Sequence, residues 1–109
     1  MSMTLFTNLK SGNFLSLSFT SAAVIFQILE IDWPREDGNN TVSIGRLRLR
    51  IERAQAIVVM PEKFEPISRY WAGFNGVRID AERAMEYLDH LALLCAFATA
   101  DGEVFMDYE

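Results

Sequence analysis

Arg-Leu-Arg-Leu-Arg-Ile, residues 46–51, alternates charged and apolar side chains with a period of two. In a β-strand successive side chains point to opposite faces of the sheet, so this alternation is typical of a strand with one buried face. We therefore predict a strand over residues 41–51, with Leu47 and Leu49 facing a core. The opposite face would carry a row of three guanidinium groups, those of Arg46, Arg48 and Arg50.

The segment before this strand predicts a hairpin. Turn-forming residues crowd positions 34–40, and Asp37 followed by Gly38 is a strong signal for a tight β-turn. β-branched and aromatic residues dominate residues 24–33, which favours a partner strand there. A helix remains open for this segment, because residues 22–30 contain no helix breaker.

The arginine row has two interpretations. In one register of the hairpin Asp32 lies opposite Arg46. Glu30 then lies opposite Arg48, and each opposite-charge pair contributes roughly 0.2–1 kcal/mol, so the row is neutralised within its own sheet. Alternatively, the guanidinium groups form a surface that binds phosphate, nucleic acid or an acidic partner, since arginine is enriched at protein interfaces.

Other stretches add strands and a connection. Residues 14–19 and 103–108 alternate apolar and polar side chains, as strands with one solvated face do. Residues 56–60 are predicted to form a buried strand that ends at Pro61. Residues 62–76 are predicted to form a long irregular connection.

A single main helix is predicted over about residues 80–100. Asp80 is a favourable N-cap, Glu82 lies where the helix dipole favours an anion, and apolar residues recur at helical spacing along the segment. Strands followed by one helix and a closing strand predict an α+β fold. We expect a single domain over residues 1–109, with the helix packed across a mostly antiparallel sheet.

The composition limits the class of protein. Half of the residues are hydrophobic and the formal net charge is -5. Nucleic acid is not the expected partner, because phosphate contacts need a positive field. The N-terminus lacks the basic and apolar regions of a secretory signal, and no apolar stretch reaches the ~20 residues of a membrane span. We therefore expect a soluble, cytoplasmic protein with no membrane partner.

Catalytic and metal-binding residues are scarce. His90, the one histidine, follows Glu86 by four residues on the polar side of the predicted helix, where an exposed ion pair explains it. Cys95, the one cysteine, lies on the inner helical face, which favours a buried, inert thiol. Glycine-rich nucleotide motifs and metal-ligand spacings do not occur in the sequence. We expect no cofactor, no metal and no catalytic residue.

Aromatic residues are concentrated in the segment predicted to be irregular. They are Phe64, Tyr70, Trp71 and Phe74. Trp, Tyr and Arg dominate binding hot spots, so Arg69, Tyr70 and Trp71 form a candidate contact surface. Alternatively, the rings fold back and seal one end of the core. Trp33 has the same two interpretations, with a cluster shared with Trp71 as one arrangement.

We predict a small, acidic, non-enzymatic module that binds and neutralises or recruits a macromolecule, as an immunity protein, inhibitor or adaptor does. Its acidic charge suits a basic protein partner such as a nuclease toxin, because complementary charge speeds encounter. The partner-binding residues would be the three arginines of the predicted strand, the contact surface around Trp71, and the carboxylates of Glu30, Asp32 and Asp107.

Two other functions stay open. One is a dimeric small-molecule-binding or catalytic α+β protein with a pocket beside the aromatic segment. The other is a nucleic-acid binder that works through the arginine strand. A homodimer is also open, because residues 91–98 are apolar on every side and need more cover than one sheet provides.

Overall fold

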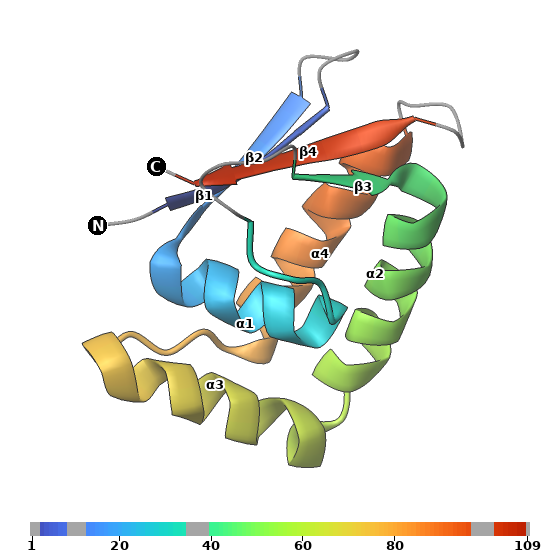
Figure 1. The fold of residues 1–109 in the computed structure, drawn as a ribbon. Coiled ribbons are helices and arrows are strands. Elements are labelled where there is room, and N and C mark those ends of the chain that lie inside the picture. The colour runs from blue at the N-terminus through green and yellow to red at the C-terminus, as the bar shows by residue number, and fades with distance from the viewer. Residues whose placement is uncertain (1–2, 9–12, 35–39, 97–101, 109) are drawn as a thin grey trace.

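An antiparallel sheet of four strands is covered on one face by helices in the computed structural model of the chain (Figure 1). The structure describes residues 3–8, 13–34, 40–96 and 102–108. Within these ranges the elements are, in chain order, β1 (Met3–Asn8), β2 (Asn13–Ser18), α1 (Phe19–Leu29), β3 (Thr41–Ser43), α2 (Ile44–Val58), α3 (Pro61–Asn75), α4 (Ala81–Ala96) and β4 (Glu103–Tyr108). The α+β class and the antiparallel sheet are confirmed. The prediction of one main helix is wrong, because the described residues form four.

The sheet has the strand order β2-β1-β4-β3, and every neighbouring pair is antiparallel. Phe6 of β1 lies between Leu15 of β2 and Met106 of β4, and all three side chains are buried on the face that the helices cover. The two strands predicted from alternating residues are confirmed as β2 and β4, although Phe19 begins a helix. Strand β1 has no counterpart among the predictions.

The strand predicted over residues 24–33 is wrong, and the helix left open as the alternative is right. Ser18 caps α1 by accepting a hydrogen bond from the backbone N–H of Ser21 at 3.4 Å. Nine of the 11 helix residues are buried, since α1 lies between the sheet and α3 (Figure 1). A helix that is apolar on nearly every side has no polar face, so its composition also fits a buried strand.

The predicted arginine strand is wrong beyond its first three residues. β3 ends at Ser43, whose hydroxyl accepts a hydrogen bond from the Arg46 N–H at 3.3 Å and so starts α2. Leu47 is fully buried but Leu49 is 62% exposed, whereas a strand would place both on one face. The buried strand predicted over residues 56–60 is also wrong, because α2 continues to Val58 before a short turn.

The segment predicted as an irregular connection forms helix α3. Pro61 stands at its start, where the missing N–H and the fixed φ of proline suit a helix. Gly76 ends it with a φ of 75°, a conformation that favours glycine. Phe64 and Ser68 are buried on its inner side, while Pro66 is exposed. Helix α3 packs on α1 and α2 and is the layer farthest from the sheet (Figure 1).

Helix α4 confirms the predicted main helix. The Asp80 carboxylate accepts a hydrogen bond from the Arg83 N–H at 2.8 Å, as expected of an N-cap. Its buried side carries Ala84, Leu88, Leu91, Leu94 and Cys95. The helix extends to Ala96, and the remainder of the predicted range lies outside the described residues, as does the predicted turn at Asp37 and Gly38.

Candidate functional site: an aromatic groove

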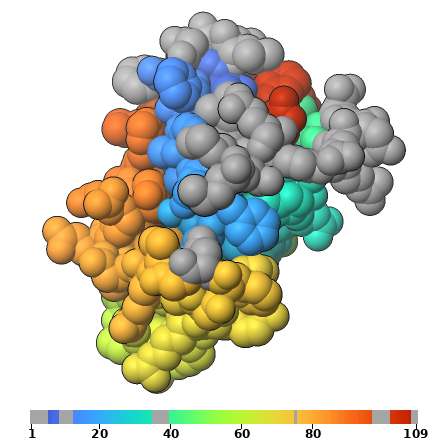
Figure 2. Space-filling view, turned by 90° about the vertical axis from the view of Figure 1, so that its left-hand side faces the viewer, coloured from blue at the N-terminus to red at the C-terminus, as the bar shows by residue number. Residues whose placement is uncertain are grey.

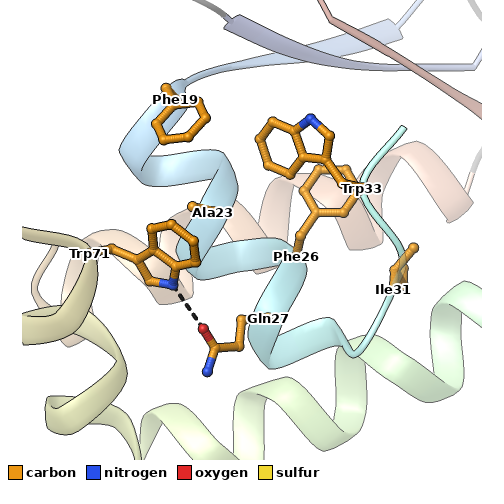
Figure 3. A pocket seen from close by; sticks show the side chains of 7 residues that line it. All are labelled: Phe19, Ala23, Phe26, Gln27, Ile31, Trp33 and Trp71. Atoms are coloured by element: carbon orange, nitrogen blue, oxygen red, sulfur yellow. Dashed lines mark hydrogen bonds between the residues drawn. The ribbon is translucent and has the colours of Figure 1, made fainter. Parts of the chain in front are cut away.

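A groove lined by aromatic side chains lies between α1, α3 and the segment that follows α1 (Figure 3). Its volume is about 480 Å³. We name it the aromatic groove, and its lining residues are Phe19, Ala23, Phe26, Gln27, Ile31, Trp33 and Trp71. A concave, mainly apolar hollow of this size is typical of binding sites, which range from ~300 to 1,000 Å³.

Helix α1 supplies the floor of the aromatic groove. Phe19, Ala23 and Phe26 are four and three residues apart, so they form one stripe along the helix. Ala23 carries only a methyl group, and the larger rings stand around it (Figure 3). The depth of the groove therefore depends on a small residue at this position.

The wall opposite α3 exists because the chain reverses sharply after α1. Glu30 adopts a left-handed conformation (φ 55°, ψ 44°), and its N–H donates to the Gln27 carbonyl at 3.1 Å. The Ile31 N–H donates to the Phe26 carbonyl at 3.2 Å, which completes a Schellman motif. This reversal carries Ile31 and Trp33 back over the helix, so that both line the groove.

Aromatic rings from separate parts of the chain meet at the groove. The ring centroid of Phe19 lies 5.6 Å from that of Trp33 and 6.4 Å from that of Trp71. Phe26 lies 5.1 Å from Trp33 and also 5.1 Å from Phe6 of the sheet. The predicted cluster of Trp33 with Trp71 is confirmed, with Phe19 as the ring that joins them. Such ring contacts stabilise the structure beyond the contribution from burying apolar area, and they hold the walls of the groove in position.

Trp71 is fixed to the groove floor by a hydrogen bond. Its indole Nε1 donates to the Gln27 Oε1 at 2.7 Å, which joins α3 to α1 (Figure 3). The seven lining side chains include no acid, base or nucleophile. The groove can therefore hold an apolar group beside the Gln27 amide, but it offers no group for proton transfer.

An exposed aromatic surface extends from the groove along α3. Tyr70 is 61% and Phe74 65% exposed, and their ring centroids lie 5.1 and 5.5 Å from that of Trp71. Figure 2 shows α3, in yellow, directly below the start of α1, in blue, on one face of the molecule. Phe64 is buried in the core, in line with the interpretation that the rings seal the core, whereas Tyr70 and Phe74 remain open to solvent and leave the contact surface a prediction.

The three arginines of the predicted strand do not form a row. Arg48 donates from Nη2 to the Cys95 carbonyl at 2.9 Å, at the C-terminal end of α4. Arg50 forms an ion pair with Glu30, with 2.9 Å between Nη1 and Oε2. Arg46 is exposed in the first turn of α2. Arg48 is two residues from each of the others and points in a nearly opposite direction, so the three do not share one surface, although Arg46 and Arg50, four residues apart, lie on the same side of α2.

The charge pairs predicted across a hairpin are therefore wrong. Glu30 does form an ion pair with an arginine, but its partner is Arg50 rather than Arg48. The predicted register fails because Glu30 follows the end of helix α1 and both arginines lie on helix α2, so no pair of strands sets these residues opposite each other. Asp32 is exposed, and none of the described residues forms an ion pair with it. A nucleic-acid surface along an arginine strand loses its geometric basis for the same reason.

Arg48 is expected to stabilise the end of α4. The last carbonyls of a helix lack intrahelical partners and carry partial negative charge, so a guanidinium there donates a hydrogen bond and opposes the dipole. Replacing Arg48→Met should lower the free energy of unfolding by about 1–2 kcal/mol, measured by urea denaturation. Arg46→Met is the control. Arg46 lies in the first turn of α2, near the positive end of the helix dipole, where a cation contributes nothing to stability or slightly lowers it, so this variant should not lower the free energy of unfolding. Equal losses in both variants would contradict the capping role.

The other predicted site residues are dispersed. Arg69 is exposed on α3, and Asp32 lies between two lining residues of the aromatic groove. Asp107 is exposed on β4, on the sheet face away from the helices, since the adjacent Met106 is buried beneath the sheet. Of the predicted contact residues, Trp71 lines the groove and the ring of Tyr70 packs against it, whereas Asp32 is only next in the chain to two lining residues.

The remaining candidates for chemistry, His90 and Cys95, do not line the aromatic groove. His90 is exposed on α4. Burial raises the pKa of the Cys95 thiol, and the nearby Arg48 guanidinium opposes only part of that rise. Cys95 is therefore a thiol at neutral pH, not a nucleophilic thiolate. In the described ranges, no three His, Cys, Asp or Glu side chains are grouped so that they could hold a metal ion.

Five of the seven groove residues were not identified from the sequence. They are Phe19, Ala23, Phe26, Gln27 and Ile31. The helical spacing of the first three is a usable signal, but it becomes visible only when α1 is interpreted as a helix. Residue type alone points to Trp33 and Trp71.

A scan of protein-family models and searches of curated proteins and of solved structures find no match to this chain. None of the helices in the described part of the chain combines the length and the apolar character needed to cross a membrane. What the chain binds must therefore be inferred from the aromatic groove and its surroundings.

Proposed function

We propose that this chain is a non-enzymatic protein-binding domain that holds an apolar segment of its partner in the aromatic groove. It would neutralise or recruit that partner, as an immunity protein, inhibitor or adaptor does. The observation that supports this most is the groove itself, in which two tryptophans and two phenylalanines line a solvent-accessible hollow of about 480 Å³. Such a lining provides contacts for binding and no group for catalysis.

The aromatic surface beyond the groove favours a macromolecular partner. Tyr70 and Phe74 continue the ring cluster from Trp71 onto the open side of α3. Contiguous exposed apolar patches of this kind mark interaction sites. Trp and Tyr are also the residues that contribute most to binding energy at protein interfaces. This surface is larger than a ligand confined to the groove would cover.

The charge of the chain favours a basic partner. The formal net charge is -5, and the exposed Asp32 lies between the lining residues Ile31 and Trp33. An acidic field speeds the encounter with a basic protein. The exposed Asp32 carboxylate, which neighbours these lining residues in the chain, can also pair with a lysine or arginine of that partner. We place the apolar anchor of the partner in the groove and its basic residues beside Asp32.

Filling the aromatic groove should weaken binding without unfolding the protein. Ala23→Leu places a branched side chain in the hollow above α1, where the partner's apolar group would sit. We expect an affinity at least ten-fold weaker, which corresponds to about 1.4 kcal/mol. Ala56→Leu, the same substitution at an exposed position of α2, is the matched control. The fluorescence of bound anilinonaphthalene sulfonate, which reports open apolar surface, should fall in Ala23→Leu alone.

Site-specific photocrosslinking in the native host tests the proposed function. A benzophenone amino acid replaces either Phe74, beside the groove, or Leu93, an exposed position on α4. We expect one discrete protein conjugate from position 74 and none from position 93. The conjugate should disappear when Ala23→Leu is also present. Absence of a conjugate from position 74, or the same conjugate from both positions, would contradict the proposal.

A small-molecule ligand is the second candidate for the same groove. The volume lies within the range of ligand sites, and the Gln27 amide could orient a polar atom of a mainly apolar compound. Thermal-shift measurements with a metabolite library separate the two functions. A compound that stabilises the wild type and Ala56→Leu but not Ala23→Leu, without a protein conjugate at position 74, would favour the small molecule.

A further inference from the structure

The lining of the aromatic groove leaves few hydrogen-bonding groups for a ligand. The polar groups among its seven side chains are the Gln27 amide and the indole N–H groups of Trp33 and Trp71. The Trp71 N–H already donates to the Gln27 Oε1 at 2.7 Å, and the Trp33 nitrogen points away from both Trp71 and Gln27 (Figure 3). A ligand therefore finds little more than the Gln27 Nε2 group.

The backbone that borders the groove is equally occupied. Two carbonyls in the last turn of α1 accept hydrogen bonds from the N–H groups of Glu30 and Ile31. Pro34 has no N–H, which leaves those of Asp32 and Trp33 in the segment after α1. Adjacent residues of a strand direct their N–H groups to opposite sides. This segment therefore cannot serve as a sheet edge for more than one residue of a ligand.

This shortage of backbone partners distinguishes between the conformations that a bound peptide could have. A strand or a polyproline helix forms no hydrogen bonds within itself, so in the groove its N–H and C=O groups would lose water without finding partners. Burial of such unpaired groups opposes binding. An α-helix pairs its own backbone groups and presents only side chains to the surface that it contacts. The groove is therefore suited to a helix.

Given the function proposed above, we propose that the segment held in the aromatic groove is an amphipathic α-helix of the partner, with basic residues on its outer face. The floor of the groove, from Phe19 to Phe26, covers seven residues of α1, or about 10 Å at about 1.5 Å per residue. A helix laid along it contributes apolar residues at positions i, i+3 or i+4, and i+7. The net charge of -5 favours the basic outer face.

The shape of the floor also suits a helix. The stripe on α1 runs large, small, large, with Ala23 between Phe19 and Phe26, and Trp71 stands over the same helix from α3 (Figure 3). A gap between large side chains on a helix surface accepts a single side chain of a second helix, as in knobs-into-holes packing. We place the central apolar residue of the partner helix over Ala23.

Peptide display tests which conformation the groove selects. Random peptides of about 16 residues, long enough for about four helical turns, are displayed on phage and selected on the immobilised full chain. Excess soluble Ala23→Leu removes peptides that do not need the open groove. We expect the retained peptides to carry apolar residues at helical spacing, with lysine or arginine between them and no internal proline. Ala56→Leu is the matched competitor and should remove these peptides, because its groove is unchanged.

The tightest retained peptide, made synthetically, provides a second measurement. Its helical circular dichroism should increase on binding to the wild type and not on mixing with Ala23→Leu. Proline at a central position of the outer face should raise the dissociation constant about ten-fold or more, because proline breaks a helix. Alanine at the same position should change it by about two-fold or less.

The selection separates failure of the helix from failure of the proposed function. Groove-dependent peptides that alternate apolar and polar residues, or that repeat proline at the spacing of a polyproline helix, would overturn the helix and leave a protein-binding groove in place. The same holds if proline and alanine weaken binding equally. If no peptide distinguishes the wild type from Ala23→Leu, the helix and the peptide-binding groove are both overturned.

Discussion

Phe64→Ala is expected to lower the free energy of unfolding by about 3–5 kcal/mol. Phe64 is fully buried on the inner side of α3, which packs against α1 and α2. Removal of the ring deletes these contacts and leaves a cavity. The helix cannot shift freely to close it, because the Ser68 hydroxyl donates to the Ile79 carbonyl at 2.5 Å and fixes α3 to the following segment. Guanidinium chloride unfolding should show a lower midpoint with an unchanged slope.

Phe74→Ala is the matched control for this prediction. It makes the same substitution on the same helix, but Phe74 is mostly exposed, so the free energy of unfolding should change by about 0.5 kcal/mol or less. Phe74 should matter for the partner instead, because its ring belongs to the open aromatic surface. Similar losses of stability in the two variants would mean that α3 does not pack through Phe64.

The elements that the sequence predicts correctly have one buried and one exposed face. In β2 the buried Leu15 and Leu17 alternate with the exposed Ser16. In α4 the buried Leu88 and Leu91 recur at helical spacing between polar residues. Where polar residues mark the outer face, the spacing of the apolar ones reports the period of the backbone.

Helix α1 has no such marker. It lies between the sheet and α3, so nearly all of its residues are buried whichever way they point. A buried strand and a buried helix are then equally compatible with Val24, Ile25 and Phe26. Tertiary burial decides between the two, and a short apolar run contains no information about it.

The candidate site was predictable from residue type but not from position. Trp71 and Tyr70 belong to the residue types that dominate interfaces, and both lie at the groove or beside it. The hollow itself forms where α3 packs on α1 and where the chain reverses at Glu30. A glutamate in the left-handed conformation gives no signal in the sequence, because glycine is the usual residue there. Ala23 and Gln27 therefore could not be recognised as lining residues.

Leu47→Ala is expected to lower the free energy of unfolding by about 2–5 kcal/mol, because Leu47 is fully buried on α2. Leu49→Ala should change it by about 0.5 kcal/mol or less, because more than half of Leu49 is exposed. The two sites are two residues apart and undergo the same substitution. Urea unfolding of both variants under one set of conditions measures the difference directly.

This pair of variants also tests why a helix forms where alternating residues predict a strand. Six alternating residues fit a strand, and within them Leu47 and Ile51 also fit a helix, since residues four apart share a helical face. The buried stripe continues through Ala54 to Val58 over the 15 residues of α2, and only a helix accommodates all of it. Comparable losses in Leu47→Ala and Leu49→Ala would place both leucines on one face. They would restore the strand, and with it the surface of aligned arginines.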